Sequence, residues 1–168
     1  LHDSGTGVML MLRDPGALRG GKVVDALVSQ IDLFPTICDV ADLPYPDWLQ
    51  GRSIMPIIRG EVEEVNDAVF GEVNFHASYE PMRSVRTRGW KYIRRYEPRH
   101  SPILTNCDDG LSKDVLMEHG WSTHAPEDEM LYDLAFDPNE TANLAQVPSL
   151  AAVREEMRGR PHAWMACT

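Results

Sequence analysis

The sequence predicts an α/β part that leads into an α+β part, and three observations support this fold class. A short continuous apolar run at residues 7–13 is typical of a strand buried on both faces of a parallel sheet. Apolar residues recur at helical spacing after Ser29, and short strand patterns separated by turn residues follow from residue 67. A terminal helix comes last, so we expect a core sheet followed by a small antiparallel sheet packed by that helix.

The first part, residues 1–66, holds the apolar run and two predicted helices. Asp14-Pro15-Gly16 ends the run with turn chemistry. Ser29 is the expected N-cap of the first helix, and Pro35 marks its start or a kink. The apolar positions of this helix share one face and are Ile31, Leu33, Phe34, Ile37, Cys38 and Ala41. Residues 53–58 form the second helix, which a glycine closes.

The second part, residues 67–168, has the pattern of a small sheet followed by a helix. Four strands are predicted, at residues 68–73, 82–87, 90–95 and 130–134. Arg88-Gly89 is the expected hairpin turn between the second and third strands. Residues 97–128 are long and aperiodic, as in segments that are either functional or loosely ordered. Ser149 caps the last helix, which Pro161 is expected to interrupt.

The charge and the apolar pattern exclude two kinds of partner. There are 26 acidic against 16 basic residues, and a net charge of −10 argues against a general binder of nucleic-acid phosphates. The longest apolar run has five residues, at 8–12, whereas a membrane span needs about 20. The three cysteines, Cys38, Cys107 and Cys167, lie far apart in no metal-binding spacing. We expect reduced thiols, as in a non-oxidising compartment.

Histidine is the first candidate for chemistry, because it can act as a base, a ligand or an anion donor near neutral pH. Among the six histidines, His76 follows directly on a predicted strand. Polar groups at the end of a strand are held by the sheet but remain open to solvent. His76 is therefore a candidate site residue, and the alternative is a capping or loop histidine.

Basic residues gather in the predicted hairpin of this acidic chain. They are Arg83, Arg86, Arg88, Lys91, Arg94 and Arg95. The planar guanidinium group fits sulfate, phosphate or carboxylate. One interpretation is that Arg83, the nearest to His76, helps to hold an anionic substrate while its neighbours are solvated. The other is a hairpin whose solvent face pairs with carboxylates elsewhere.

Catalytic machinery is missing from the sequence. It holds no nucleophile elbow, no P-loop and no dinucleotide-binding fingerprint. Asp3-Ser4-Gly5 and Asp108-Asp109-Gly110 lack the further carboxylates of a calcium loop, so we expect turns there.

Five segments, in the same order, resemble those of one family. They are residues 7–13 with Pro15-Gly16, residues 24–36, residues 49–53 with Pro56, residues 85–87 with 90–93, and residues 131–134 with Asp137-Pro138, Glu140 and Asn143-Leu144-Ala145. By this resemblance the chain is identified as the C-terminal portion of a sulfatase of the alkaline-phosphatase-like superfamily. Residues 79–85, with His76 before them, are similar to the sulfamidase (N-sulfoglucosamine sulfohydrolase) branch.

The resemblance implies hydrolysis of sulfate esters or sulfamates on a sulfated saccharide. In this family a formylglycine, made within a Cys-x-Pro-x-Arg type motif, attacks sulfur, and a divalent cation, usually calcium, polarises the sulfate oxygens. None of the three cysteines begins such a motif, and the metal-binding aspartates of the family are missing. Both groups are therefore expected upstream of Leu1, in an N-terminal part of the same protein, and the isolated chain is expected to be inactive.

The resemblance also implies that the C-terminal sheet borders the substrate cleft. We expect no catalytic or metal-binding residue in this chain and a substrate-binding set of His76, Glu72, Asn74 and Arg83 that contacts the sugar or its charged groups. Two alternatives stay open. One is a phosphodiesterase or phosphonate hydrolase of the same superfamily, and the other is a non-catalytic fragment or interaction module.

Overall fold

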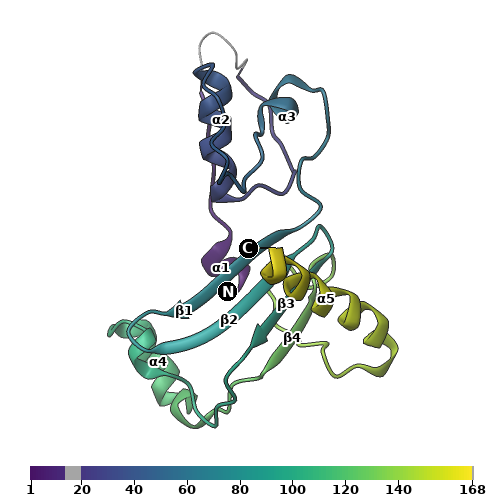
Figure 1. The fold of residues 1–168 in the computed structure, drawn as a ribbon. Helices are drawn as coiled ribbons and strands as arrows, with labels where there is room; N and C mark the ends of the chain where they lie inside the picture. Colours follow the sequence, from purple (N-terminus) through teal and green to yellow (C-terminus); the bar gives the residue numbers. More distant parts are fainter. Residues whose placement is uncertain (14–19, 168) are drawn as a thin grey trace. The chain divides into compact units, whose positions relative to one another are not determined.

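The computed structural model describes residues 1–13 and 20–167, which form two compact units. One unit comprises residues 7–69, and the other comprises residues 1–6 together with residues 70–168 (Figure 1). Residues 1–6 thus belong with a sheet that lies far from them in the sequence. The assignment of residues 1–66 to the end of a larger α/β core stays a prediction.

The apolar run at residues 7–13 is not a strand in the structure, contrary to the prediction. Its side chains at residues 8–12 are exposed. A strand needs a neighbour that takes up its N–H and C=O groups, and the described residues of this unit offer none. The predicted turn at Asp14-Pro15-Gly16 lies outside the described residues.

Both predicted helices of the first unit are present. A 3-10 turn at Gln30–Asp32 leads into α2 (Leu33–Val40), with Ser29 at the N-cap. Helix α3 (Met55–Arg59) ends at Gly60, whose φ of 76° is left-handed. Much of the apolar face of α2 is exposed, at Ile31, Phe34, Ile37 and Val40.

A buried aspartate organises this unit. Asp32 is 1% exposed and accepts hydrogen bonds from the backbone N–H groups of Ser29 and Arg52, both at 2.8 Å. The side chain of Asn66 donates a third hydrogen bond to Asp32, at 2.7 Å. One carboxylate therefore joins the start of α2 to two later segments, and its burial is offset by these donors.

A four-stranded sheet dominates the other unit (Figure 1). Its strands lie in the order of the sequence and are β1 (Val69–Phe75), β2 (Tyr79–Arg86), β3 (Trp90–Arg95) and β4 (Glu129–Asp133). Strand β3 is antiparallel to both β2 and β4, with Val85 opposite Tyr92 and Ile93 opposite Met130. The four predicted strands and the hairpin turn at Arg88-Gly89 are confirmed.

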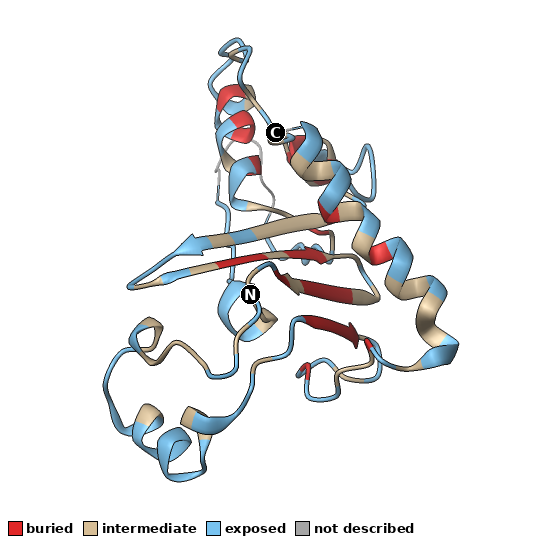
Figure 2. Ribbon diagram, turned by 60° about the horizontal axis from the view of Figure 1, so that its bottom comes forward, coloured by how far each residue is buried: buried red, intermediate tan, exposed pale blue. Residues whose placement is uncertain are grey.

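The two faces of the sheet are covered by different segments. On one face Met82, Ile93, Met130 and Tyr132 form an apolar core, against which Leu1, Val73 and Leu134 pack. Residues 1–6, which include the short helix α1 (Asp3–Thr6), contact this face. Figure 2 shows that burial is concentrated in β2, β3 and β4, whereas β1 at the edge is more exposed.

Helix α5 (Ala151–Cys167) packs against the opposite face (Figure 1). Near its end the ring of Trp164 stacks on Phe70 of β1, with centroids 5.2 Å apart. The helix runs through Pro161, contrary to the prediction that this proline interrupts it. Pro161 is fully buried, so the packing of its ring offsets the backbone hydrogen bond that a proline removes.

The long segment at residues 97–128 contains short helices. They are 3-10 turns at Leu104–Asn106 and Trp121–Thr123 and helix α4 (Leu111–Glu118), in which no residue is buried. None of the helices in the described ranges is long and apolar enough to cross a membrane. The three cysteines are free thiols.

Candidate functional site

The structure brings together three of the four predicted site residues. Glu72 and Asn74 lie on β1, and Arg83 lies on the neighbouring strand β2. Arg83 Nη1 donates to Asn74 Oδ1 at 2.9 Å, and Arg83 Nε lies 3.2 Å from Glu72 Oε2. These contacts neutralise the guanidinium group and join the edge strand to the sheet.

Arg83 also binds the backbone around it. Its Nη1 donates to the carbonyl of Met82 at 2.9 Å and to that of Val73 at 3.3 Å. The side chain is only 15% exposed. This arrangement favours a role in holding β1, and the contact of Arg83 with an anionic substrate stays a prediction.

His76 lies in the turn of residues 76–78 between β1 and β2, and it is exposed. Its backbone N–H donates to the carbonyl of Ser78 at 3.3 Å and closes the turn. Within the described ranges the imidazole makes no hydrogen bond or ion pair, so its ring nitrogens are open to a ligand. His76 thus follows the end of β1, whereas Glu72 and Arg83 lie within their strands, and His76 is not bonded to the other three residues.

Asn106 braces this turn, and no pattern in the sequence predicts that role. Its Oδ1 accepts the N–H of Ser78 at 2.8 Å, and its Nδ2 donates to Glu80 Oε2 at 2.8 Å. The hydroxyl of Thr105 lies 2.9 Å from that of Ser78. Asn106 is 28 residues from Ser78, in the aperiodic segment, and the only signal is the general tendency of asparagine to bond backbone groups.

Glu80, next to the turn, is held as a carboxylate. Burial raises the pKa of Glu80, but hydrogen bonds from Asn106 and Arg95, with the charge of Arg95, outweigh burial and leave that pKa below its usual value. Arg95 is itself buried and pairs with Glu80. The expectation that the neighbours of Arg83 are solvated is therefore wrong for Arg95.

The same expectation is wrong for Lys91, whose side chain is 2% exposed. Lys91 Nζ donates to one oxygen of Asp3 at 2.8 Å, and Arg86 Nε donates to the other at 2.8 Å. Burial raises the pKa of Asp3, but these two partners outweigh it and lower the pKa below its usual value. Asp3 therefore holds the N-terminal segment against the sheet. A turn was expected at Asp3, but this residue begins helix α1.

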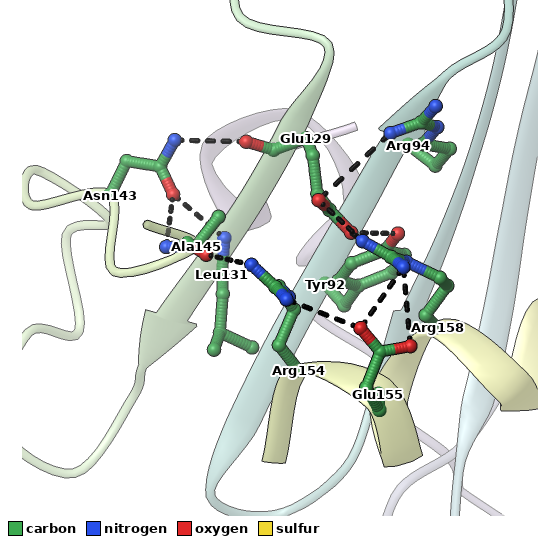
Figure 3. Close-up of polar contacts among 9 residues, drawn as sticks. All are labelled: Tyr92, Arg94, Glu129, Leu131, Asn143, Ala145, Arg154, Glu155 and Arg158. Atoms are coloured by element: carbon green, nitrogen blue, oxygen red, sulfur yellow. Dashed lines mark hydrogen bonds and ion pairs between the residues drawn. The ribbon is translucent and has the colours of Figure 1, made fainter. Parts of the chain in front are cut away.

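A third cluster joins α5 to the sheet (Figure 3). Arg158 Nη2 lies 2.6 Å and 2.8 Å from the two carboxylate oxygens of Glu129, and the hydroxyl of Tyr92 donates to Glu129 at 2.7 Å. Burial raises the pKa of Glu129, but Tyr92 and Arg158 outweigh it and lower that pKa. Burial, and then Glu129, raise the pKa of Tyr92, which stays a neutral donor. The cluster is an anchor whose charged groups are engaged with one another.

In the part of the chain that the structure describes, no three His, Cys, Asp or Glu side chains are grouped so as to hold a metal ion. These residues therefore do not fit the divalent cation that the resemblance implies. What they offer is an exposed imidazole on a braced turn, with an exposed carboxylate and an exposed amide on the preceding strand β1. Such groups can bind and orient a polar ligand.

Two curated relatives match nearly the whole chain. An ulvan-active sulfatase of Formosa agariphila is 29% identical over 98% of this chain and 34% of its own length. N-sulphoglucosamine sulphohydrolase of Homo sapiens is 30% identical over 98% of this chain and 37% of its own length. The chain thus spans about a third of the length of these relatives.

Solved structures share the fold. One described as a 2-O GAG sulfatase has a TM-score of 0.57 and 28% identity, over 80% of this chain and 24% of its own. A phosphonate monoester hydrolase of Agrobacterium radiobacter has a TM-score of 0.53 and 25% identity, over 80% of this chain and 24% of its own. Residues 1–109 match the family described as N-sulphoglucosamine sulphohydrolase, C-terminal. This match covers most of the sheet and all of the predicted site, and the chain belongs to that family.

Proposed function

We propose that the chain is the C-terminal portion of a sulfatase that hydrolyses sulfate esters or sulfamates on a sulfated saccharide. The observation that carries the proposal is the family match over residues 1–109. The names of the two curated relatives, a sulphohydrolase and an ulvan-active sulfatase, support the same reaction and a saccharide substrate.

In this proposal the exposed groups on β1 and in the turn that follows it bind the saccharide. The exposed imidazole of His76 donates a hydrogen bond to a sulfate or hydroxyl oxygen. Glu72 and Asn74 are exposed on β1 and offer oxygen acceptors to sugar hydroxyls. Arg83, which is hydrogen-bonded to Asn74 and ion-paired with Glu72, keeps them in place.

The proposal assigns the formylglycine and the divalent cation, calcium by the resemblance, to residues that precede Leu1 in the whole protein. The cation supplies charge neutralisation at the sulfuryl group. The described residues do not fit the cation, so the role proposed for this chain is to bind and orient the substrate. The proposed partners of this unit are therefore the sulfated sugar and the rest of the same protein.

The test is the His76→Ala variant of the full-length enzyme. A hydrogen bond that involves a charged group contributes about 1.5–3 kcal/mol, so kcat/KM for a sulfated saccharide should fall by about tenfold or more. A small aryl sulfate has no sugar for His76 to contact, so its kcat/KM should change by less than about twofold. Steady-state kinetics on both substrates measures the difference.

His100→Ala is the matched control, because His100 is also exposed, in the segment that follows β3. The His100→Ala variant should leave kcat/KM for both substrates unchanged. Equal losses on the two substrates in His76→Ala would refute the sugar-side role.

Phosphonate ester hydrolysis is the second candidate, since a phosphonate monoester hydrolase shares this fold at 25% identity. Assaying the full-length protein with a sulfate ester, a sulfamate and a phosphonate monoester separates the two reactions. A Cys-x-Pro-x-Arg motif and an aspartate pair upstream of Leu1 support the sulfatase. A protein that turns over none of the three substrates would be the non-catalytic interaction module.

A further inference from the structure

The turn that carries His76 is held in place by a distant segment. Its own closing hydrogen bond, from His76 N–H to the Ser78 carbonyl, is long, at 3.3 Å. The bonds that Ser78 makes to Asn106 and Thr105 are shorter, at 2.8 Å and 2.9 Å. A three-residue turn with one weak internal bond owes its conformation to these outside contacts.

The side-chain amide of Asn106 binds Ser78 as the backbone of a neighbouring strand would. Its oxygen accepts the N–H of Ser78 at 2.8 Å, and its nitrogen donates to the carbonyl of the same residue at 3.3 Å. The amide satisfies both backbone groups of a turn residue that lacks a strand partner.

Asn106 is fixed in turn by charged groups. Its Nδ2 donates to Glu80 at 2.8 Å, and Glu80 is paired with the buried Arg95 of β3. Arg99 donates to the carbonyl of Tyr79 at 2.7 Å and holds the first residue of β2. The brace therefore runs from the interior of the sheet to the turn.

We infer that Asn106 is a positioning residue that presets the His76 turn for the saccharide, and this inference rests on the function proposed above. A preset turn binds a ligand without first losing conformational freedom, so its loss weakens binding of whatever the turn contacts. Asn106 lies outside the apolar core of Met82, Ile93, Met130 and Tyr132. Its removal should therefore loosen the turn while the sheet stays folded.

The kinetic test uses Asn106→Ala in the full-length enzyme. KM for the sulfated saccharide should rise about three- to tenfold, as expected for the loss of one or two hydrogen bonds. The kcat for that substrate, and both constants for a small aryl sulfate, should change by less than about twofold. The double variant with His76→Ala should be no worse than His76→Ala alone, because Asn106 acts through His76.

A second readout follows the turn itself. The Ser78 amide should exchange its hydrogen about tenfold faster in Asn106→Ala, while the Ile93 amide of β3 keeps its protection.

Asn66→Ala is the matched control for the kinetic test. The side chain of Asn66 donates to Asp32 and to the Leu27 carbonyl in the other unit, so its loss should change kcat/KM for both substrates alike.

The outcomes separate this inference from the proposed function. If His76→Ala impairs the saccharide selectively but Asn106→Ala does not, or if their effects add, the positioning role is overturned and the sugar-side role of His76 stands. Unchanged exchange at Ser78 also overturns it. Equal losses on both substrates in His76→Ala overturn the sugar-side role, and the inference with it.

Discussion

At Gly51 two backbone segments meet too closely for a side chain. A Cβ built there would lie 2.0 Å from the carbonyl oxygen of Ile31. The next residue, Arg52, donates its N–H to Asp32, the buried carboxylate that organises this unit. A side chain at residue 51 must push the two segments apart and break that hydrogen bond.

We expect Gly51→Ala to lower the free energy of unfolding by about 1–3 kcal/mol, as overpacking does. Urea denaturation of the full-length protein measures the change. Gly159→Ala is the control, because Gly159 is exposed in α5 and a Cβ there meets nothing within 4 Å. It should raise stability by about 0.5–1 kcal/mol through helix propensity. Equal stability of Gly51→Ala and the parent protein would contradict the close approach.

Single residues show which interactions a sequence can predict. The N-cap at Ser29 and the end of the second helix at Gly60 are confirmed, because each depends only on its neighbours along the chain. The position of Asp32 between Arg52 and Asn66, 20 and 34 residues away, depends on the fold. No local pattern distinguishes this aspartate from an exposed one.

At the scale of elements, α5 is fixed to the sheet by Arg158. Its partner Glu129 is 8% exposed, and a buried carboxylate without a partner costs about 3–5 kcal/mol. Arg158 is itself 34% exposed, so water partly replaces it. We expect Arg158→Ala to lower the free energy of unfolding by about 2 kcal/mol, less than a fully buried pair would lose.

The control for this prediction is Arg59→Ala. Arg59 and Glu61 are more than half exposed and 4.0 Å apart, so their pair contributes about 0–0.5 kcal/mol. Chemical denaturation of the two variants side by side tests the contrast. The anchor role of Arg158 fails if both variants lose the same small amount.

The outcome for each element follows from where its hydrogen bonds go. The β2–β3 hairpin is confirmed because its turn and both strands lie within one short stretch of sequence. Residues 7–13 have the composition of a buried strand, but a strand also needs a neighbour, which composition does not supply. At Pro161 the local tendency of proline to end a helix is outweighed by tertiary burial, so the helix continues.

In the candidate site, too, local patterns predict the strand ends but not the contacts between distant residues. The place of His76 after a strand is confirmed because the end of a strand can be located in the sequence, and its contact with a substrate stays a prediction. Its brace at Asn106 belongs to a segment without periodicity, and only the folded chain brings the two together. The ion pair of Arg83 with Glu72 and its hydrogen bond to Asn74 likewise depend on strand pairing, which the sequence does not specify.

Across the whole molecule, the net charge of −10 conceals a sheet unit in which three cations pair with buried or partly buried carboxylates. Lys91 pairs with Asp3, Arg95 with Glu80 and Arg158 with Glu129. The first pair joins β3 to the N-terminal segment, and the second joins β3 to the start of β2. The third pair joins β4 to helix α5. The folded unit therefore depends on three ionised carboxylates.

This dependence predicts how stability changes with pH. The pKa values of Asp3, Glu80 and Glu129 lie below their usual values in the folded protein. A carboxyl with a lowered folded pKa stabilises above its unfolded pKa, near 4, and this stability is lost as pH falls through the folded pKa. We expect the urea midpoint of the full-length protein to be flat from about pH 7 to 5 and to fall below about pH 4.

Glu80→Gln should lower the midpoint at pH 7 and make the acid decline shallower, because one of the three carboxylates is gone. Glu63→Gln, which removes an exposed carboxylate in the other unit, should leave the profile unchanged. If the midpoint rises on acidification, or if Glu80→Gln and Glu63→Gln give the same profile, the paired carboxylates do not stabilise the sheet in this way.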